Sequence, residues 1–526
     1  LLYTMEFIKS KLRKLTSNDK SEDFNVQSTM SSNSSFSISD KIDEDFDFQK
    51  TYSHLYDIPI FRKILFKAKK ISNNESLFRV HQVLDEINQG GFFSLDGAKL
   101  QQYMFSGLPD ELPVLRTLVW KLALKYPNVQ IIHTPKWQEE IDQRRAEYFA
   151  LVKEHYKYIE EYNNRKRHLL DDKSKLTKEK IEKLTQTVPE FVSEKQSSTH
   201  SKSDLHPSDH PLNSNTDSNW NHYFKDMELM EEIQKDVRRT RAQMSFFFMP
   251  ADSSLEISNE EIALKADYTI EHTKLSKSKI ENDFESHGDV LTRILYIFAK
   301  EHPSIRYVQG MNEVLATIYY QFCQDNDCDN DQFLGYDLDL KGSPKSNSEK
   351  LGEVNIHKLK DYQKIEADSY MCFTSLMDEI KDLFIREKDQ SRSGIQTRIK
   401  GVNLLLRELD KDIYAQFTEY SVEIQFFMFR WYTLLFTQEY EMPDVLRLWD
   451  SILSFVKIEC NKVTDKFMFL NFLCLAAIMM KKEEIMKSDF AGIMMAFQNM
   501  DYLEVSNHIK SADKILTFYR DKYTNK

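Results

Sequence analysis

The sequence predicts an all-α fold, and composition and patterning both support this prediction. The 526 residues include only 12 Gly and 12 Pro, well below the usual frequencies of about 7% and 5%, so the turn residues that many short strands require are scarce. Phe and Tyr are abundant, at 35 and 25 residues, and supply large apolar side chains for helix packing. The length exceeds the roughly 250 to 300 residues of a single core, so more than one structural unit is expected.

The first 50 residues are predicted to be disordered. Residues 16–50 consist largely of Ser, Asp and Asn, which bury too little apolar surface to offset the entropy lost when a backbone becomes ordered. Residues 1–7 are too short for a signal peptide and lead directly into a charged segment, so secretion is not expected. Because the chain begins with Leu, either Met5 is the initiator or the sequence is a fragment.

Helical spacing of apolar residues is strong between the polar segments. In residues 290–298, apolar side chains fall at i, i+1, i+4, i+5, i+7 and i+8, which marks one face of a helix. The same spacing recurs in residues 373–384, and further apolar helices are expected at residues 422–438 and 445–456. Residues 467–480 form the most apolar stretch, but it is shorter than the roughly 18 residues of a membrane span. We therefore expect a core helix there and no membrane span.

These patterns define the expected organisation. Residues 51–99 are predicted to be a helical lead-in to a large helical domain of residues 100–455, and residues 456–526 are predicted to complete it with C-terminal helices. Two polar tracts, at about residues 163–218 and 325–350, are expected to be surface insertions. No βαβ alternation and no internal repeat are present in the sequence.

Charge and cysteine content exclude several functional classes. A net charge of −12 argues against binding of nucleic acid, which requires a basic face. Five cysteines are too few for a disulfide framework in a chain of this length and lack the spacing of a zinc site, so a reducing cytoplasmic environment and no metal are expected.

The other features of the sequence offer no metal, nucleotide or acyl-transfer site. The segment from Asp325 opens like a calcium loop, but Asn330 and Tyr336 stand where Gly and a bidentate Glu are needed, so calcium is not expected. His287 is interpreted as a solvated loop residue. No P-loop and no G-x-S-x-G motif is present in the sequence, so we expect the chain to bind no nucleotide and to carry out no acyl chemistry itself.

The first of three notable segments is GLPDELPVLRTLVW, which contains Gly107, Pro109, Arg116 and Trp120. A Gly-Pro turn is expected to open a helix that carries Arg116 and Trp120 at i and i+4, on one face. The alternative is a simple helix start with an exposed arginine stacked on an aromatic ring.

The second segment is IQKDVRRT, in which Ile233, Asp236 and Arg239 follow one another at intervals of three residues and Thr240 closes the motif. This spacing places an apolar anchor, a carboxylate and a guanidinium on one helix face. Asp236 can hold the guanidinium of Arg239 ready for phosphate recognition. The alternative is an exposed ion pair that contributes only a few tenths of a kcal/mol.

The third segment is YVQGMNEV, which contains Tyr307, Gln309, Gly310, Met311 and Asn312. A glutamine directly before a glycine, between two helices, can present its amide to solvent on backbone that is free to adopt unusual dihedrals. An amide can orient a water molecule but cannot act as a general base. The alternative is a solvated loop glutamine next to a helix-capping glycine.

Together, in this order, the three segments resemble the TBC domain of Rab GTPase-activating proteins, whose hallmarks are R-x-x-x-W, I-x-x-D-x-x-R and Y-x-Q-G-M-N. The similarity extends through FFMFRWYTLLFTQEYEMPDVLRLWDSIL and covers roughly residues 100–480. The spacing from Pro109 to Arg116 is longer than in the compact family form, which shifts the expected start of that helix. The tract between Trp120 and Ile233 is also expanded, so a lengthened surface loop is expected.

The resemblance implies that Arg239 and Gln309 act in trans on the nucleotide of a GTP-bound Rab-family GTPase, with Arg239 as the arginine finger and Gln309 positioning the attacking water. It implies that Asp236 orients Arg239. It assigns a supporting role for the two fingers to the remaining motif residues, Arg116, Trp120, Ile233, Thr240, Tyr307, Gly310, Met311 and Asn312.

Under this interpretation the chain needs no cofactor of its own, because GTP and Mg²⁺ arrive with the partner. It is expected to be cytoplasmic, recruited peripherally to endomembranes through the GTPase, and to regulate vesicle trafficking. Two alternatives remain, a non-catalytic Rab-binding scaffold or effector and a helical adaptor unrelated to GTPases. Intact Arg239 and Gln309 argue against the scaffold, which needs neither residue.

Overall fold

The computed structural model describes residues 51–52, 55, 59–88, 97–126, 135–156, 219–253, 255, 284–324, 359–385, 391, 394–455, 467–498, 500 and 504–523. Several sequence predictions fall outside these residues. They are the disorder of residues 1–50, the insertions at 163–218 and 325–350, and the calcium-like segment that begins at Asp325.

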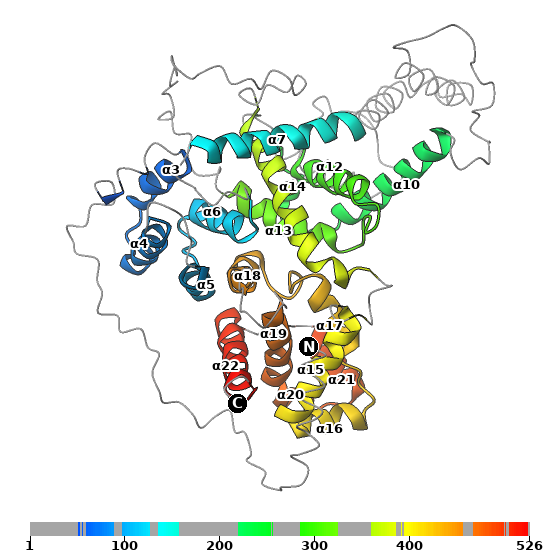
Figure 1. The fold of residues 1–526 in the computed structure, drawn as a ribbon. Coiled ribbons are helices and arrows are strands. Elements are labelled where there is room, and N and C mark those ends of the chain that lie inside the picture. The colour runs from blue at the N-terminus through cyan, green and yellow to red at the C-terminus, as the bar shows by residue number, and fades with distance from the viewer. Residues whose placement is uncertain are drawn as a thin grey trace, which may run out of the picture. The chain divides into compact units, whose positions relative to one another are not determined.

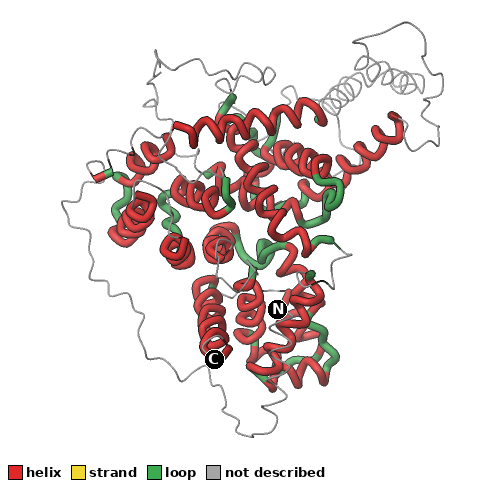
Figure 2. The backbone as a smooth tube through the Cα atoms, in the orientation of Figure 1, coloured by secondary structure: helices red, strands yellow, loops and turns green. Residues whose placement is uncertain are grey.

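The described part of the chain is helical, as predicted (Figures 1 and 2). Its only extended pairing is an isolated bridge between Pro250 and Ser286. Among the described helices, none is long and apolar enough to cross a membrane.

The chain divides into two compact units. Unit 1 comprises residues Leu1–Arg144, Glu313–Pro344 and Ala367–Lys526, and unit 2 comprises Arg145–Asn312 and Lys345–Glu366. The helices of unit 1 are α3 (Pro59–Ala68), α4 (Asn74–Asn88), α5 (Gly97–Ser106), α6 (Pro113–Ala123), η8 (Lys381–Leu383), α15 (Ile395–Leu409), α16 (Lys411–Glu419), α17 (Gln425–Thr433), α18 (Met442–Ser454), α19 (Met468–Met480), α20 (Lys482–Ile485), α21 (Phe490–Gln498) and α22 (Val505–Tyr523).

The division falls within three further helices, α7 (Pro135–His155), α13 (Met311–Cys323) and α14 (Asp361–Ile380). Unit 2 adds α10 (Asn219–Val237), the short 3₁₀ helix η4 (Ser245–Phe248) and α12 (His287–Glu301).

The core of unit 1 includes the most apolar stretch of the sequence. This stretch forms α19, which packs against α22 and α15 and is buried along most of its length. The predicted core helix is therefore confirmed. The helix predicted at residues 422–438 is shorter than expected, because α17 ends at Thr433 and Leu435 and Phe436 adopt left-handed backbone with φ of 49° and 61°. Two consecutive left-handed residues cannot continue a right-handed helix.

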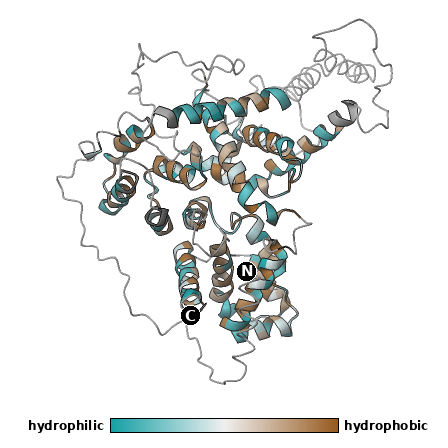
Figure 3. Cartoon of the chain, in the orientation of Figure 1, coloured by the Kyte–Doolittle hydropathy of each residue, from teal (hydrophilic) through white to brown (hydrophobic). Residues whose placement is uncertain are grey.

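The core of unit 2 is built on α12, whose apolar face was predicted from residues 290–298. That face is buried, and α12 packs against α10 and η4. The helix begins with a capping box, in which Ser286 and Asp289 exchange side-chain to backbone hydrogen bonds. Figure 3 shows that α7 is largely hydrophilic, whereas apolar turns recur along α12.

The interpretation of His287 as a solvated loop residue is wrong. His287 is the first residue of α12, and its ring stacks on Phe246 of η4 with centroids 4.2 Å apart. Burial lowers the pKa of His287 to about 4, so the ring is neutral at physiological pH. The capping box that follows Glu285 was the local sign that a helix begins here.

Candidate functional site

The second sequence motif lies at the carboxyl end of α10. Ile233 and Asp236 are buried in the last turns of this helix, which ends at Val237. Arg239 and Thr240 therefore lie just beyond the helix, in a turn where the Arg239 amide donates to the Asp236 carbonyl oxygen over 3.0 Å. The prediction of one continuous helix face thus holds for Ile233 and Asp236 but not for Arg239. The turn frees the Arg239 side chain from the face of the helix.

The predicted pairing of Asp236 with Arg239 is present. Arg239 Nη2 donates to Asp236 Oδ1 over 2.5 Å. The two partners differ in environment, because the Asp236 carboxylate is buried whereas 60% of the Arg239 side chain is exposed. The alternative of an exposed ion pair is therefore wrong for the carboxylate. A fixed carboxylate holds one edge of the guanidinium while the rest stays open to solvent.

The third motif supplies the other half of the same network. The Tyr307 hydroxyl donates to Asp236 Oδ2 over 2.8 Å and lies 3.2 Å from Asn312 Oδ1. Asn312 Nδ2 donates to Thr240 Oγ1 over 2.8 Å, and Thr240 Oγ1 donates to the Asp236 carbonyl oxygen over 3.1 Å. All of these side chains except Arg239 are buried. The end of α10 is thereby fixed to the start of α13 within unit 2.

Gln309 lies on the loop that this network holds. Its side chain is exposed, as the sequence predicted. The next residue, Gly310, adopts left-handed backbone with φ of 105°, and its amide donates to Asn312 Oδ1 over 3.0 Å. Met311 is fully buried, and its sulfur accepts a hydrogen bond from the Val308 amide over 3.4 Å. The backbone on both sides of Gln309 is therefore anchored while its amide stays accessible.

The surroundings of Tyr307 keep its hydroxyl protonated. Burial, followed by the nearby Asp236 carboxylate, raises the pKa of Tyr307 far above its usual value. The hydroxyl therefore remains a donor to Asp236 at any physiological pH. The two carboxylate oxygens have separate tasks, because Oδ1 accepts from Arg239 and Oδ2 accepts from Tyr307.

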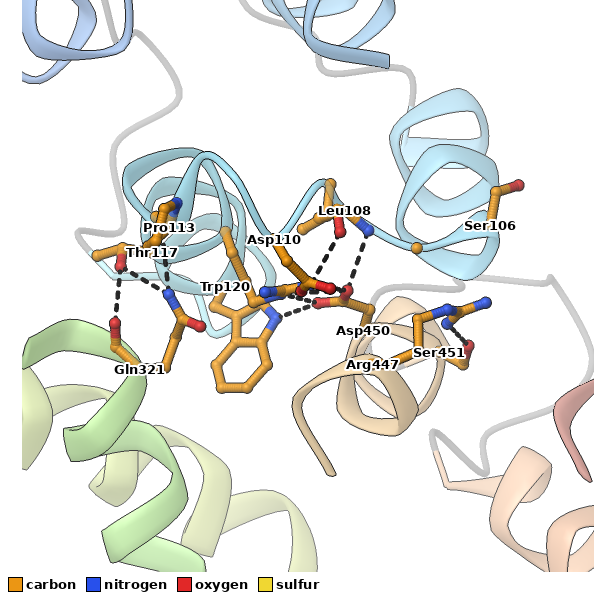
Figure 4. A network of polar contacts seen from close by, with 12 residues as sticks. Ser106, Leu108, Asp110, Pro113, Thr117, Trp120, Gln321, Arg447, Asp450 and Ser451 are labelled. Atoms are coloured by element: carbon orange, nitrogen blue, oxygen red, sulfur yellow. Dashed lines mark hydrogen bonds and ion pairs between the residues drawn. The ribbon is translucent and has the colours of Figure 1, made fainter. Parts of the chain in front are cut away.

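The first sequence motif has a different location and different contacts. Arg116 and Trp120 lie on α6 in unit 1, and both bind Asp450 of α18. Figure 4 shows Trp120 next to Asp450. Arg116 Nε donates to Asp450 Oδ1 over 3.1 Å, and Trp120 Nε1 donates to the same oxygen over 2.8 Å. The Leu108 amide donates to Asp450 Oδ2 over 3.0 Å. The contacts of Arg116 and Trp120 thus stabilise the packing of α6 on α18, and their predicted role for the fingers remains a prediction.

The alternative of an exposed arginine stacked on an aromatic ring is wrong, because Arg116 is 2% exposed. The helix starts after the Gly107–Pro109 turn, as the long spacing from Pro109 to Arg116 led us to expect. It begins at Pro113, whose fixed φ suits the first helical position.

Sequence reasoning missed several charged residues that the structure buries. Asp450 lies on α18 directly after the buried Trp449 and is itself fully buried. Arg293 interrupts the predicted apolar face of α12, and it makes a bidentate pair with Glu366 over 2.7 and 2.6 Å. The Tyr148 hydroxyl donates to Glu366 over 2.5 Å. For Arg293 the available signal was a lone charge within an apolar helix face, since such a charge is retained only when a partner neutralises it.

No group of three or more His, Cys, Asp or Glu side chains is placed to hold a metal ion within the described residues. The arrangement in unit 2 instead offers a guanidinium and an amide, both exposed and both attached to one buried polar network. Such groups can stabilise negative charge and orient a water molecule on another molecule.

Comparisons with known proteins identify relatives of this chain. The model of the Rab-GTPase-TBC domain family matches residues 251–486, which include Gln309 and Asn312 but begin after Arg239. Human TBC1 domain family member 13 is 30% identical over 449 residues, which cover 79% of this chain and 93% of that protein. The GTPase-activating protein GYP1 of Saccharomyces cerevisiae is 30% identical over 177 residues, 32% of this chain and 24% of that protein.

The fold also matches a solved structure. The crystal structure of the Ypt/Rab-GAP domain of Gyp1p has a TM-score of 0.51 and 18% identity to this chain, with 84% of this chain and 98% of that chain covered. At this identity the match supports the helical fold alone. The family follows from the sequence, through the extent and coverage of the match to the human relative: the chain belongs to the Rab-GTPase-TBC domain family.

Proposed function

We propose that this protein is a GTPase-activating protein that accelerates GTP hydrolysis by a GTP-bound, Rab-family small GTPase, with Arg239 and Gln309 acting in trans. One observation carries the proposal: both residues are exposed and both are attached to the buried network of Asp236, Tyr307 and Asn312 in unit 2. Membership of the Rab-GTPase-TBC family supports the class of partner.

The proposed chemistry follows from the two functional groups. Phosphoryl transfer spreads negative charge over the equatorial oxygens of the γ-phosphate, so a fixed guanidinium there stabilises the transition state more than the ground state. Asp236 fixes Arg239 before the partner binds, which lowers the entropy lost in reaching that state. Gln309 would orient the attacking water through its amide, and GTP and Mg²⁺ would come with the partner.

The competing proposal is a non-catalytic scaffold that binds Rab proteins without turnover. The burial of Asp236 argues against it. A buried carboxylate is costly unless it is hydrogen-bonded, and this one accepts from both Arg239 and Tyr307 to hold an exposed guanidinium in place. Mere docking would not require this arrangement.

The test uses the purified full chain and a panel of GTP-loaded Rab proteins in single-turnover hydrolysis. We expect acceleration of at least one GTPase, and we expect Arg239→Ala and Gln309→Ala to remove most of it while binding is largely kept. Loss of an arginine finger costs on the order of 10³ to 10⁵ in rate in the well-characterised case of Ras and its activator. Lys487→Ala, which removes an exposed charge from unit 1, serves as the control and should change nothing.

Two results would change the assignment. If the variants lose binding along with activity, Arg239 and Gln309 are docking residues. If the wild-type chain binds a Rab protein but accelerates none, the scaffold proposal is correct. In cells, we further propose that the GTPase recruits the chain peripherally to endomembranes, where it regulates vesicle trafficking. Depletion of the partner GTPase should then release the chain from the membrane fraction.

A further inference from the structure

Arg306 adopts a backbone conformation that its residue type disfavours. It lies between α12 and Gln309, with φ of 60°, and its amide donates to the His302 carbonyl oxygen over 2.8 Å. Left-handed backbone brings the Cβ atom of an L-residue close to its own carbonyl, so glycine is the usual choice at such positions. The same loop uses a glycine at the left-handed position 310. Position 306 carries an arginine instead, so its backbone is strained.

The structure shows no internal contact that offsets this strain. Among the residues described, the Arg306 side chain is exposed and takes part in no hydrogen bond, ion pair or ring contact. Arg241, which is also left-handed with φ of 45°, differs because its side chain is buried within the protein. A strained residue without internal compensation supports the hypothesis that its side chain acts outside the fold.

Arg306 is close enough to Gln309 for both to contact one bound molecule. Three residues of extended chain span at most about 11 Å, and the arginine side chain is long and flexible. Arg306 also directly precedes Tyr307, whose hydroxyl binds Asp236. A GTPase whose nucleotide lies at Arg239 and Gln309 would therefore bring its own surface next to Arg306.

We propose that Arg306 is a docking residue that binds a carboxylate on the surface of the partner GTPase. This inference rests on the function proposed above. Arg239 is held by a buried carboxylate before binding, as suits a group that acts on a transition state. Arg306 has no such holder among the described residues, so its side chain becomes ordered only on association. An exposed charge of this kind changes association and affinity, and its effect is screened by salt.

The test compares Arg306→Gly with the matched control Lys125→Gly. Lys125 follows α6 in unit 1, is exposed, has φ of 59° and approaches Glu379 only to 4.0 Å. Each change removes one exposed positive charge and one strained left-handed residue, so neither should lower the melting temperature. In steady-state hydrolysis with the GTPase as substrate, we expect Arg306→Gly to raise KM about three- to tenfold at unchanged kcat, as for a contact at the rim of an interface. Lys125→Gly should alter neither constant.

Two further arms distinguish a docking charge from other roles. Raising the salt concentration should raise the KM of the wild-type chain and reduce the difference in KM between the wild type and Arg306→Gly. Arg306→Lys should recover part of the affinity that Arg306→Gly loses. If the wild type is active and Arg306→Gly has an unchanged KM, this inference is overturned while the proposed function stands. A loss of kcat at constant KM would place Arg306 on the phosphate and also overturn it. Failure of the wild type to accelerate any Rab protein would overturn the proposed function, and this inference with it.

Discussion

The Tyr307 hydroxyl donates a hydrogen bond to the Asp236 carboxylate over 2.8 Å, across 71 residues of sequence. This contact joins the motif that carries Arg239 to the motif that carries Gln309. Asn312 reinforces it from the same side by donating to Thr240. The Arg239 guanidinium and the Gln309 amide are thus both attached to one buried polar network. A substitution that disrupts the network should therefore affect both groups.

Removal of the Tyr307 hydroxyl tests this connection. Tyr307→Phe leaves Asp236 Oδ2 without its buried donor, so the free energy of unfolding should fall by about 1–3 kcal/mol. Acceleration of GTP hydrolysis should fall as well, because the carboxylate that holds Arg239 is less fixed. Denaturant unfolding and single-turnover hydrolysis measure the two effects. Tyr420→Phe, at an exposed tyrosine of unit 1, should change neither, and wild-type behaviour of Tyr307→Phe would contradict the proposed connection.

A double-mutant cycle between Tyr307 and Asp236 gives a second prediction. Asp236→Asn removes the charge that orients Arg239 and weakens the acceptor for Tyr307. Because both changes act on one network, the double variant with Tyr307→Phe should lose less stability than the sum of the single variants, by about 0.5–3 kcal/mol. Unfolding of the four proteins in urea provides the measurement. Additive losses would show that the hydrogen bond carries no coupling.

Substitution of Asp450 should be among the most destabilising changes in unit 1. Asp450→Ala leaves the buried Arg116 charge, the Trp120 indole and the Leu108 amide without their shared acceptor. Loss of one partner of a buried ion pair costs about 3–5 kcal/mol of unfolding free energy. Asp444→Ala, at an exposed position of the same helix, should stay within about 0.5 kcal/mol of the wild type. Equal stability of the two variants in guanidinium unfolding would refute the assigned role of Asp450.

Acidification should destabilise unit 1 through His508. The ring is fully buried, with Nδ1 2.7 Å from the Tyr440 hydroxyl and Nε2 2.8 Å from the Leu473 carbonyl oxygen. Burial lowers its pKa from 6.5 to about 4. Between these two values the unfolded chain binds a proton that the folded chain does not, so stability is complete above pH 6.5 and falls towards pH 4.

The free energy of unfolding should fall with a defined slope as the pH is lowered. One histidine contributes about 1.4 kcal/mol per pH unit within that window. The neutral variant His508→Gln should show a shallower fall in unfolding free energy between pH 6.5 and 4.5, and the similarly lowered pKa of His287 leaves part of the slope in place. Identical pH profiles for the wild type and the variant would rule out His508 as the source.

Local sequence patterns were sufficient for features that depend on neighbours in the chain. The apolar face of α12 was predictable from residues 290–298, because a helix repeats every 3.6 residues and buries one stripe. The pair between Asp236 and Arg239 was predictable because residues three apart are adjacent in a helix, and they remain adjacent in the turn that follows α10. The exposed Gln309 before a left-handed glycine followed from the backbone freedom of Gly310.

Patterns were insufficient where packing decides. The end of α17 at Thr433 was missed because the apolar run continues through the left-handed Leu435 and Phe436, so hydropathy alone does not mark the break. His287 was misjudged because its burial comes from η4, which precedes α12 across a long stretch of sequence.

The sequence by itself therefore determined the helical class of this protein, its family motifs and the residues that carry its proposed chemistry. The tertiary structure alone decided that Arg116 and Trp120 bind Asp450, more than 300 residues away, and that Tyr307 and Asn312 support the turn of Arg239. The reason is physical: contacts within one helical turn follow from the periodicity of the backbone, whereas a contact between distant segments exists only after the helices that carry them have packed.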